Sequence, residues 1–271
     1  MDMFRSTYSL AEDEMLHYRR DGHILLRGVA SPEEVASVRT VITGLTDEVA
    51  RRRALQGRPG GYAAMFTQVT NLWRMDERVR AFVCAPRFAR IAAELMGVAG
   101  VRLYHDQALI KEPGGKPTPW HLDHYYWPLA TEHTITMWMA LVDIPPEMGS
   151  MSFATGSHRA GTFPPLEISD RSEEYFERLI QDRNIPTPSY SLRAGDATFH
   201  SGDLLHRAFG NASGERREVM TVIYFADGTH VADLVYDHLR VDRDAFLPGC
   251  EPGQPAASDL NPLLYHAAAG R

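Results

Sequence analysis

Pro119-Trp120-His121-Leu122-Asp123 is the stretch from which the fold and the chemistry are best approached. It lies among short apolar runs of the kind that form β-strands. Successive side chains of a strand point to opposite faces, so His121 and Asp123 would project from the same face. An imidazole and a carboxylate together suit a divalent first-row metal ion. Because H-x-D also recurs by chance, the pair needs support from elsewhere in the chain.

The part of the chain around this stretch predicts a β-rich core. From residue 101 onward, runs rich in Thr, Val, Ile, Tyr and Phe end at Gly or Pro. Many short strands with irregular connections are typical of a sandwich or a jelly roll. The predicted strands are 101–111, 120–127, 134–143, 150–154, 189–200, 204–209 and 216–226. The fold class is therefore mainly β, with residues 101–227 as the core.

The first hundred residues predict helices that support and flank this core. Ser31 with Glu34 and Ser9 with Glu12 have the spacing of a capping box, which marks a helix start. A further amphipathic helix is predicted to begin at Pro86. We therefore expect residues 1–100 to be mostly helical.

We expect one domain over residues 1–271, because single β-rich enzymes of this length are common. Residues 160–188 place prolines around a charged helix-like segment and predict an insertion between strands. Such an insertion is either a lid or a surface excursion without a role in the chemistry. Residues 228–271 are expected to form a C-terminal extension packed on the body.

A second segment supplies a candidate third metal ligand. His206 follows a Gly-Asp turn and precedes a strand that begins with two arginines, Arg216 and Arg217. An arginine can bind a carboxylate through two hydrogen bonds. Strand alternation allows only one of the pair to face inward and does not say which one. His200 is a rival third ligand, since it also precedes a glycine-containing turn.

Together these segments resemble the phytanoyl-CoA dioxygenase family over roughly residues 20–227. The family pattern is H-x-D, a distal His and an Arg eleven residues later, which corresponds here to His121, Asp123, His206 and Arg217. Three further stretches carry the resemblance: residues 106–115, 136–141 and 149–158. The resemblance implies a cupin-like jelly roll, the double-stranded β-helix, that binds iron(II) and uses 2-oxoglutarate and O2. Related halogenases lack the metal-binding carboxylate, whereas this chain keeps Asp123, which disfavours halogenation.

The resemblance also implies roles for residues around the metal. Arg217 would bind the distal carboxylate of 2-oxoglutarate, Gln107 and Thr136 would hydrogen-bond its proximal part, and Trp138 would line its pocket. The alternative for Trp138 is a core aromatic residue on an apolar strand. Candidates for the substrate pocket, with a core position as the alternative for the first three, are Tyr125, Tyr126, Trp127, Phe66 and Arg74.

Composition narrows the partners. The formal net charge is −7, so no overall basic field is present to attract nucleic acid, and a small-molecule substrate is expected. Cys84 and Cys250 form no C-x-x-C pair, and the first fourteen residues carry acids without an apolar run. We therefore expect a cytoplasmic protein that does not interact with membranes, either as a monomer or as a homodimer.

The predicted function is an iron(II)- and 2-oxoglutarate-dependent dioxygenase that hydroxylates a C–H bond of a small molecule, such as a secondary-metabolite intermediate, with release of succinate and CO2. Cyclisation, epimerisation and desaturation are possible outcomes of the same chemistry. One alternative is a cupin-like isomerase or hydrolase that uses another divalent metal ion at the same residues. The other is a non-catalytic jelly roll that only binds a ligand.

Overall fold

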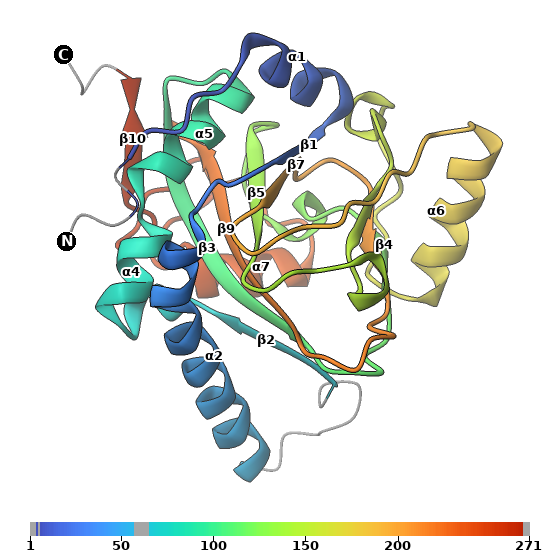
Figure 1. Cartoon of the computed structure of the whole chain (residues 1–271). Coiled ribbons are helices and arrows are strands. Elements are labelled where there is room, and N and C mark those ends of the chain that lie inside the picture. The colour runs from blue at the N-terminus through green and yellow to red at the C-terminus, as the bar shows by residue number, and fades with distance from the viewer. Residues whose placement is uncertain (1–3, 5, 57–64, 268–271) are drawn as a thin grey trace.

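The core consists of two antiparallel sheets in the computed structural model, which describes residue 4 and residues 6–56 and 65–267 (Figure 1). The large sheet has the strand order β1-β7-β5-β9-β3-β10, with β2 also paired to β3, and the small sheet has the order β4-β8-β6. The strands are β1 His23–Leu26, β2 Phe66–Thr70, β3 Gly100–Lys111, β4 Thr118–His121, β5 Thr134–Ala140, β6 Met151–Phe153, β7 Ala197–Ser201, β8 His206–Ala208, β9 Arg217–Ala226 and β10 Leu263–His266. This arrangement confirms a mainly β, jelly-roll fold with flanking helices.

Helices cover the outer face of the large sheet. The α-helices are α1 Glu12–Asp21, α2 Pro32–Leu55, α4 Glu77–Val83, α5 Pro86–Met96, α6 Asp170–Asp182 and α7 Asp237–Phe246. Short 3-10 helices are η1 Leu72–Arg74, η2 His124–Tyr126, η3 Pro146–Met148 and η4 Ser157–Arg159. Met137, Phe199 and Met220 belong to the largest apolar cluster together with side chains from α2, α4 and α5. By alternation, Thr136 and His200 point to the opposite, inner face of the sheet.

Of the three predicted helix starts, those at Ser31 and Pro86 are correct and the one at Ser9 is wrong. Ser31 caps α2, since its side chain accepts a hydrogen bond from the Glu34 N–H and the Glu34 carboxylate accepts one from the Ser31 N–H. Helix α1 begins later than the Ser9 capping box predicts, because Ala11 is its N-cap. There the Glu14 carboxylate accepts the Ala11 N–H at 2.9 Å, so Ala11 and Glu14 take the positions predicted for Ser9 and Glu12.

The predicted strand 120–127 is shorter than expected. Strand β4 ends at His121, and Asp123 has helical dihedral angles (φ −65°, ψ −43°) at the start of η2. Strand alternation therefore does not explain why Asp123 faces His121. The turn after β4 brings it there instead.

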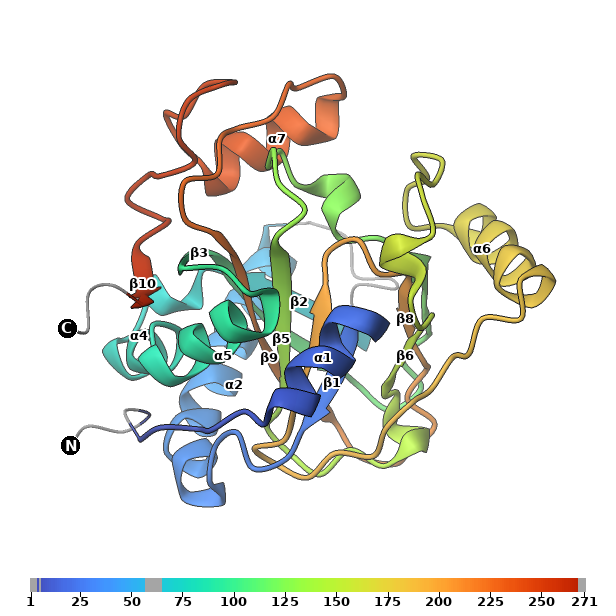
Figure 2. The ribbon, with the colours of Figure 1, turned by 90° about the horizontal axis from the view of Figure 1, so that it is seen from above.

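Two helical segments outside the β core, within 160–188 and 228–271, pack against it. Helix α6, within 160–188, packs beside β4 of the small sheet (Figure 1). Helix α7, within 228–271, lies across one end of the large sheet (Figure 2), and β10 pairs with β3. Among the described residues, none of the helices combines the length and the apolar character needed to cross a membrane.

Candidate metal centre and its cavity

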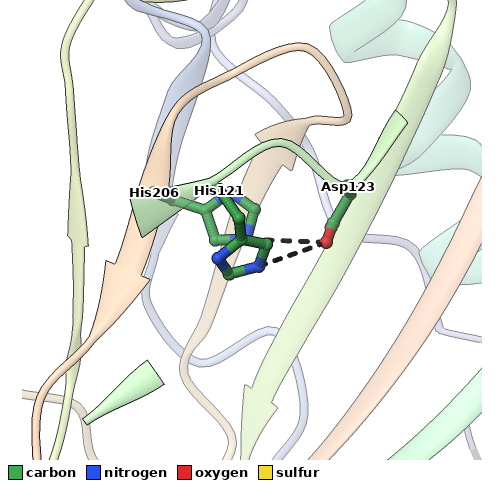
Figure 3. Close-up of side chains that lie close together, drawn as sticks. All are labelled: His121, Asp123 and His206. Atoms are coloured by element: carbon green, nitrogen blue, oxygen red, sulfur yellow. Dashed lines mark ion pairs between the residues drawn. The ribbon is translucent and has the colours of Figure 1, made fainter. Parts of the chain in front are cut away.

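Three side chains converge between the two sheets (Figure 3). His121 ends β4 and His206 begins β8, and the two residues are direct partners in the small sheet. The Asp123 Oδ1 atom lies 3.6 Å from His121 Nε2 and 3.7 Å from His206 Nε2. The ligand atoms of all three residues lie within 4.8 Å of one another. The structure thus brings together the three residues that the sequence singled out.

Backbone carbonyls fix both imidazole rings. His121 Nδ1 lies 2.7 Å from the Pro119 carbonyl oxygen, and His206 Nδ1 lies 2.9 Å from the Leu204 carbonyl oxygen. A carbonyl can only accept a hydrogen bond, so each Nδ1 carries the proton and each Nε2 presents a lone pair. This tautomer is the one that a metal-ligating histidine requires.

The charge of the cluster also favours a cation. Burial lowers the pKa of His206 well below its ordinary value, so this ring is neutral near pH 7. Burial opposes the ionisation of Asp123, but positive charge among the surrounding rings of His206, His121 and His200 holds its pKa well below the usual range, and a cation bound between them would act in the same direction. The centre therefore combines two imidazole lone pairs with a carboxylate. These donors fit a divalent metal ion of the iron type.

His200, the rival third ligand, lies beside this cluster. It comes from β7, is 1% exposed, and places Nε2 3.4 Å from the other Asp123 oxygen, Oδ2. The ligand atoms of His121, Asp123 and His206 lie close to one another, and His200 does not belong to this group. His206 is therefore the better placed third ligand.

The two arginines at the start of β9 have different environments. Arg217 is 2% exposed, lines the cavity, and donates from Nη1 to the Gly149 carbonyl at 2.7 Å. Its guanidinium carbon lies 5.3 Å from the centre of the Trp138 ring. Arg216 turns to the outer side, where it pairs with Asp47. The structure thus answers the question that strand alternation left open.

Gln107 and Thr136 lie on the same inner face. Both line the cavity. The Thr136 hydroxyl donates to Asp123 Oδ2 at 3.3 Å, and the Gln107 side-chain oxygen accepts a hydrogen bond from the Gln68 amide at 3.0 Å. Thr136 is therefore in contact with the candidate metal ligands, while Gln107 is held further along β3.

A cavity of about 1070 Å³ extends from this centre between the sheets. Of the predicted substrate-pocket residues, Phe66, Tyr126 and Trp127 line it. Tyr125 does not line it and packs instead on Tyr126, Tyr236 and His238. Arg74 is exposed on η1, outside the cavity.

Several cavity residues are not among those predicted from the sequence. Asp242 and Phe246 come from α7, in a segment where no local pattern indicates a site. His105 lines the cavity from β3. The alternation of β3 was a usable signal for His105. Nothing in the sequence predicts that α7 folds back over this strand.

Comparisons with known proteins agree with this site. The family model for phytanoyl-CoA dioxygenase (PhyH) matches residues 18–219. An ectoine dioxygenase from Bordetella parapertussis is 25% identical over 238 residues, 80% of this chain and 75% of that protein.

Two solved structures are similar over almost the whole chain. The first is the non-haem alpha-ketoglutarate-dependent carbocyclase SnoK from nogalamycin biosynthesis, which is 28% identical and has a TM-score of 0.76 over 96% of this chain and 98% of that one. The second is the epimerase SnoN in complex with Fe3+, alpha ketoglutarate and nogalamycin RO, which is 29% identical and has a TM-score of 0.73 over 94% and 98%. The chain therefore belongs to the phytanoyl-CoA dioxygenase family, which confirms the resemblance and the enzyme class predicted from its sequence.

Proposed function

We propose that this dioxygenase holds iron(II) with His121, Asp123 and His206 and hydroxylates a C–H bond of a small-molecule substrate. The observation that carries the proposal is the paired orientation of the two imidazoles. Both Nδ1 atoms are bound to backbone carbonyls, so two Nε2 lone pairs face one ionised carboxylate. Without a cation between them, three electron-rich groups would be buried together at a cost in free energy.

The surrounding side chains are suited to position 2-oxoglutarate. The Arg217 guanidinium lies buried in the cavity, where it can bind the distal carboxylate through charge-assisted hydrogen bonds. Trp138 supports the guanidinium face, and Thr136 orients Asp123. Iron(II), 2-oxoglutarate and O2 together supply the oxidation of the substrate, with release of succinate and CO2. The protein positions the reactants and excludes water.

A buried Arg217 also weighs against the two alternatives. A hydrolase or isomerase with another divalent metal ion has no need for an arginine at this depth of the cavity. The same holds for a jelly roll that only binds a ligand. Both alternatives predict that succinate does not form.

Ring closure or epimerisation is a second candidate outcome. It is favoured by the similarity to SnoK and SnoN, which are described as a carbocyclase and an epimerase. The mass of the product separates the outcomes once a substrate is known. Hydroxylation adds an oxygen atom, ring closure removes two hydrogens, and epimerisation leaves the mass unchanged.

The first experiment adds iron(II) and 2-oxoglutarate to metal-free protein without oxygen. The wild type should show the visible charge-transfer band of iron-bound 2-oxoglutarate. His206→Ala should lose the band, and the matched variant His200→Gln should keep it. If the wild type binds metal and gives no band, the proposal is wrong and the isomerase or hydrolase takes its place. If His200→Gln alone loses the band, the third ligand has been assigned to the wrong histidine.

A further inference from the structure

One wall of the cavity lies outside the part of the chain that the family model matches. The match ends at residue 219, whereas α7, residues 237–246, contributes Asp242 and Phe246 to the cavity. The helix crosses one end of the large sheet (Figure 2) and is fastened to η2, where the His238 ring contacts the Tyr125 carbonyl at 3.0 Å. Residues of α7 are therefore candidates for selecting the substrate.

A bulge in β3 turns two neighbouring side chains toward this wall. In the pairing of β3 with β9, Leu103 lies opposite Tyr224 and His105 lies opposite Ile223, so Tyr104 is an extra residue. Such a bulge breaks the strand alternation and re-aims side chains. Tyr104 and His105 consequently both face α7, where Tyr104 donates a hydrogen bond to Asp242 and His105 stacks on Phe246 at 4.0 Å.

Asp242 is acidic and has no basic partner among the described residues. Its hydrogen-bond partner is the neutral Tyr104 hydroxyl. The nearest arginine in sequence, Arg243, pairs with Glu251 and Asp244 at 2.8 Å each. Burial raises the pKa of Asp242 to about 7, and burial lowers the pKa of His105 to about 4. His105 is thus neutral near pH 7 and does not supply the missing positive charge.

Four other charged residues that line the cavity, Asp123, Arg217, Arg207 and Glu173, already have a partner or a proposed role. Asp123 belongs to the metal centre, and Arg217 is placed for the cosubstrate carboxylate. At the other side of the cavity, Arg207 pairs with Glu173 at 2.8 Å. Asp242 differs from these because no basic side chain among the described residues pairs with its carboxyl group, which is bound to the Tyr104 hydroxyl.

The walls next to Asp242 are aromatic. Trp127 lies 5.6 Å from Tyr104 between ring centres, and Phe246 lies 5.6 Å from Tyr104. Tyr126 and Ile223 also line this part of the cavity. A carboxylate among aromatic rings is a favourable environment for an organic cation, because ring faces and the carboxylate both attract positive charge.

We propose that Asp242, held by Tyr104, binds a protonated amine of the substrate, whose apolar body packs between Trp127 and Phe246. The inference rests on the function proposed above and adds a substrate class to it: a ring-bearing molecule with a basic nitrogen. Asp242 is a specificity-determining residue in this proposal, and Tyr104 is a positioning residue.

Three probes with the same ring system and different charge test this class. Tryptamine, its neutral analogue tryptophol and the acid indole-3-propionate are titrated by calorimetry into protein loaded with iron(II) and 2-oxoglutarate without oxygen. Tryptamine should bind at least about fivefold more tightly than either analogue. In Asp242→Asn its affinity should fall about tenfold, as expected when one partner of a partly buried charge pair is removed. Tryptophol binding should not change.

The control variant is Asp244→Asn, on the same helix and outside the cavity, which should leave all three affinities unchanged. Tyr104→Phe should weaken tryptamine alone, by a few fold. The proposal is overturned if tryptamine binds no better than tryptophol, or if Asp242→Asn does not weaken it. The charge-transfer band of the same samples distinguishes a failure of the proposed iron site from a failure of the proposed amine site. A missing band in the wild type contradicts the iron site, whereas a normal band without amine preference contradicts only the role of Asp242.

Discussion

Arg216 and Arg217 are neighbours in sequence with opposite environments. Arg216 immediately precedes β9 and points to the outer side, where Asp47 and Glu112 neutralise it, the latter at 2.8 Å. Arg217 lies on the inner face, against Trp138. The pleat of a strand separates them, so two residues of identical chemistry form a natural matched pair for experiment.

Arg217→Ala should raise the dissociation constant of 2-oxoglutarate by about tenfold to a hundredfold, because hydrogen bonds to a charged group contribute about 1.5–3 kcal/mol each. Arg216→Ala removes only two partly exposed ion pairs and should change this constant by less than about twofold. Titration of the charge-transfer band with 2-oxoglutarate measures both. Similar effects of the two variants would show that overall positive charge, and not the inner guanidinium, attracts the cosubstrate.

The metal-centre residues could be predicted from sequence because their spacing is local or follows a family pattern. Strand alternation predicted that His121 and Asp123 face the same side. Only His121 lies in a strand, since Asp123 lies in the turn beyond β4. Asp242 had no such signal. Its position depends on how α7 packs on a bulged strand more than a hundred residues earlier in the chain, and no sequence pattern encodes that contact.

At the scale of elements, α6 is fastened to the small sheet by two carboxylates. Glu173 accepts the backbone N–H of Trp120, and Glu177 accepts its indole N–H, both at 2.7 Å. Arg207 of β8 pairs with both carboxylates. The polar face of α6 therefore contacts the strand that ends in His121. Insertion 160–188 was recognisable from its prolines, but this attachment was not.

The double variant Glu173→Gln, Glu177→Gln should loosen α6 from the sheet. Its neutral side chains weaken the hydrogen bonds to Trp120 and Arg207, each worth about 1 kcal/mol or less at these half-exposed positions. Hydrogen exchange of the α6 amides should speed up by about threefold to tenfold, while exchange in β5 stays unchanged. Glu174→Gln, on the exposed side of the same helix, is the control. Equal rates in all three proteins would mean that apolar packing alone holds the helix.

The whole molecule combines predictable elements with pairings that are not predictable. Helix starts such as Ser31 and strands such as β3, β5 and β9 follow from short-range patterns. The strand order does not, because β9 joins β5 and β3, and β10 pairs with β3 from the far end of the chain. These contacts depend on burial of matching faces over the entire chain, which local patterns do not encode.

Stability of the whole molecule should depend on pH through buried histidines such as His23. This ring is 5% exposed, contacts the Thr155 hydroxyl at 3.0 Å and stacks on Phe153, and burial lowers its pKa to about 4. Between pH 6.5 and 4 the unfolded chain binds a proton that the folded chain excludes. The free energy of unfolding therefore falls as the pH decreases through this window, by up to about 3 kcal/mol from His23.

This dependence is measured by guanidinium unfolding of the metal-free protein from about pH 7.5 to 4.5. The range begins about one unit above the ordinary histidine pKa. His23→Gln should flatten the slope by about one proton relative to the wild type. The control His17→Gln, at an exposed position of α1, should not. If both variants keep the wild-type slope, His23 takes up its proton in the folded protein as readily as in the unfolded chain.

The central position of β9 has a consequence for synthesis on the ribosome. Strands β7 and β5 can pair as soon as residue 201 has emerged, and β2 and β3 can pair much earlier. The two pairs remain separate until residues 217–226 arrive and join them. The strand that completes the sheet also begins with Arg217. A prematurely terminated chain that ends before this strand lacks the sheet connection and the arginine together, so truncation yields no partly assembled protein able to consume 2-oxoglutarate.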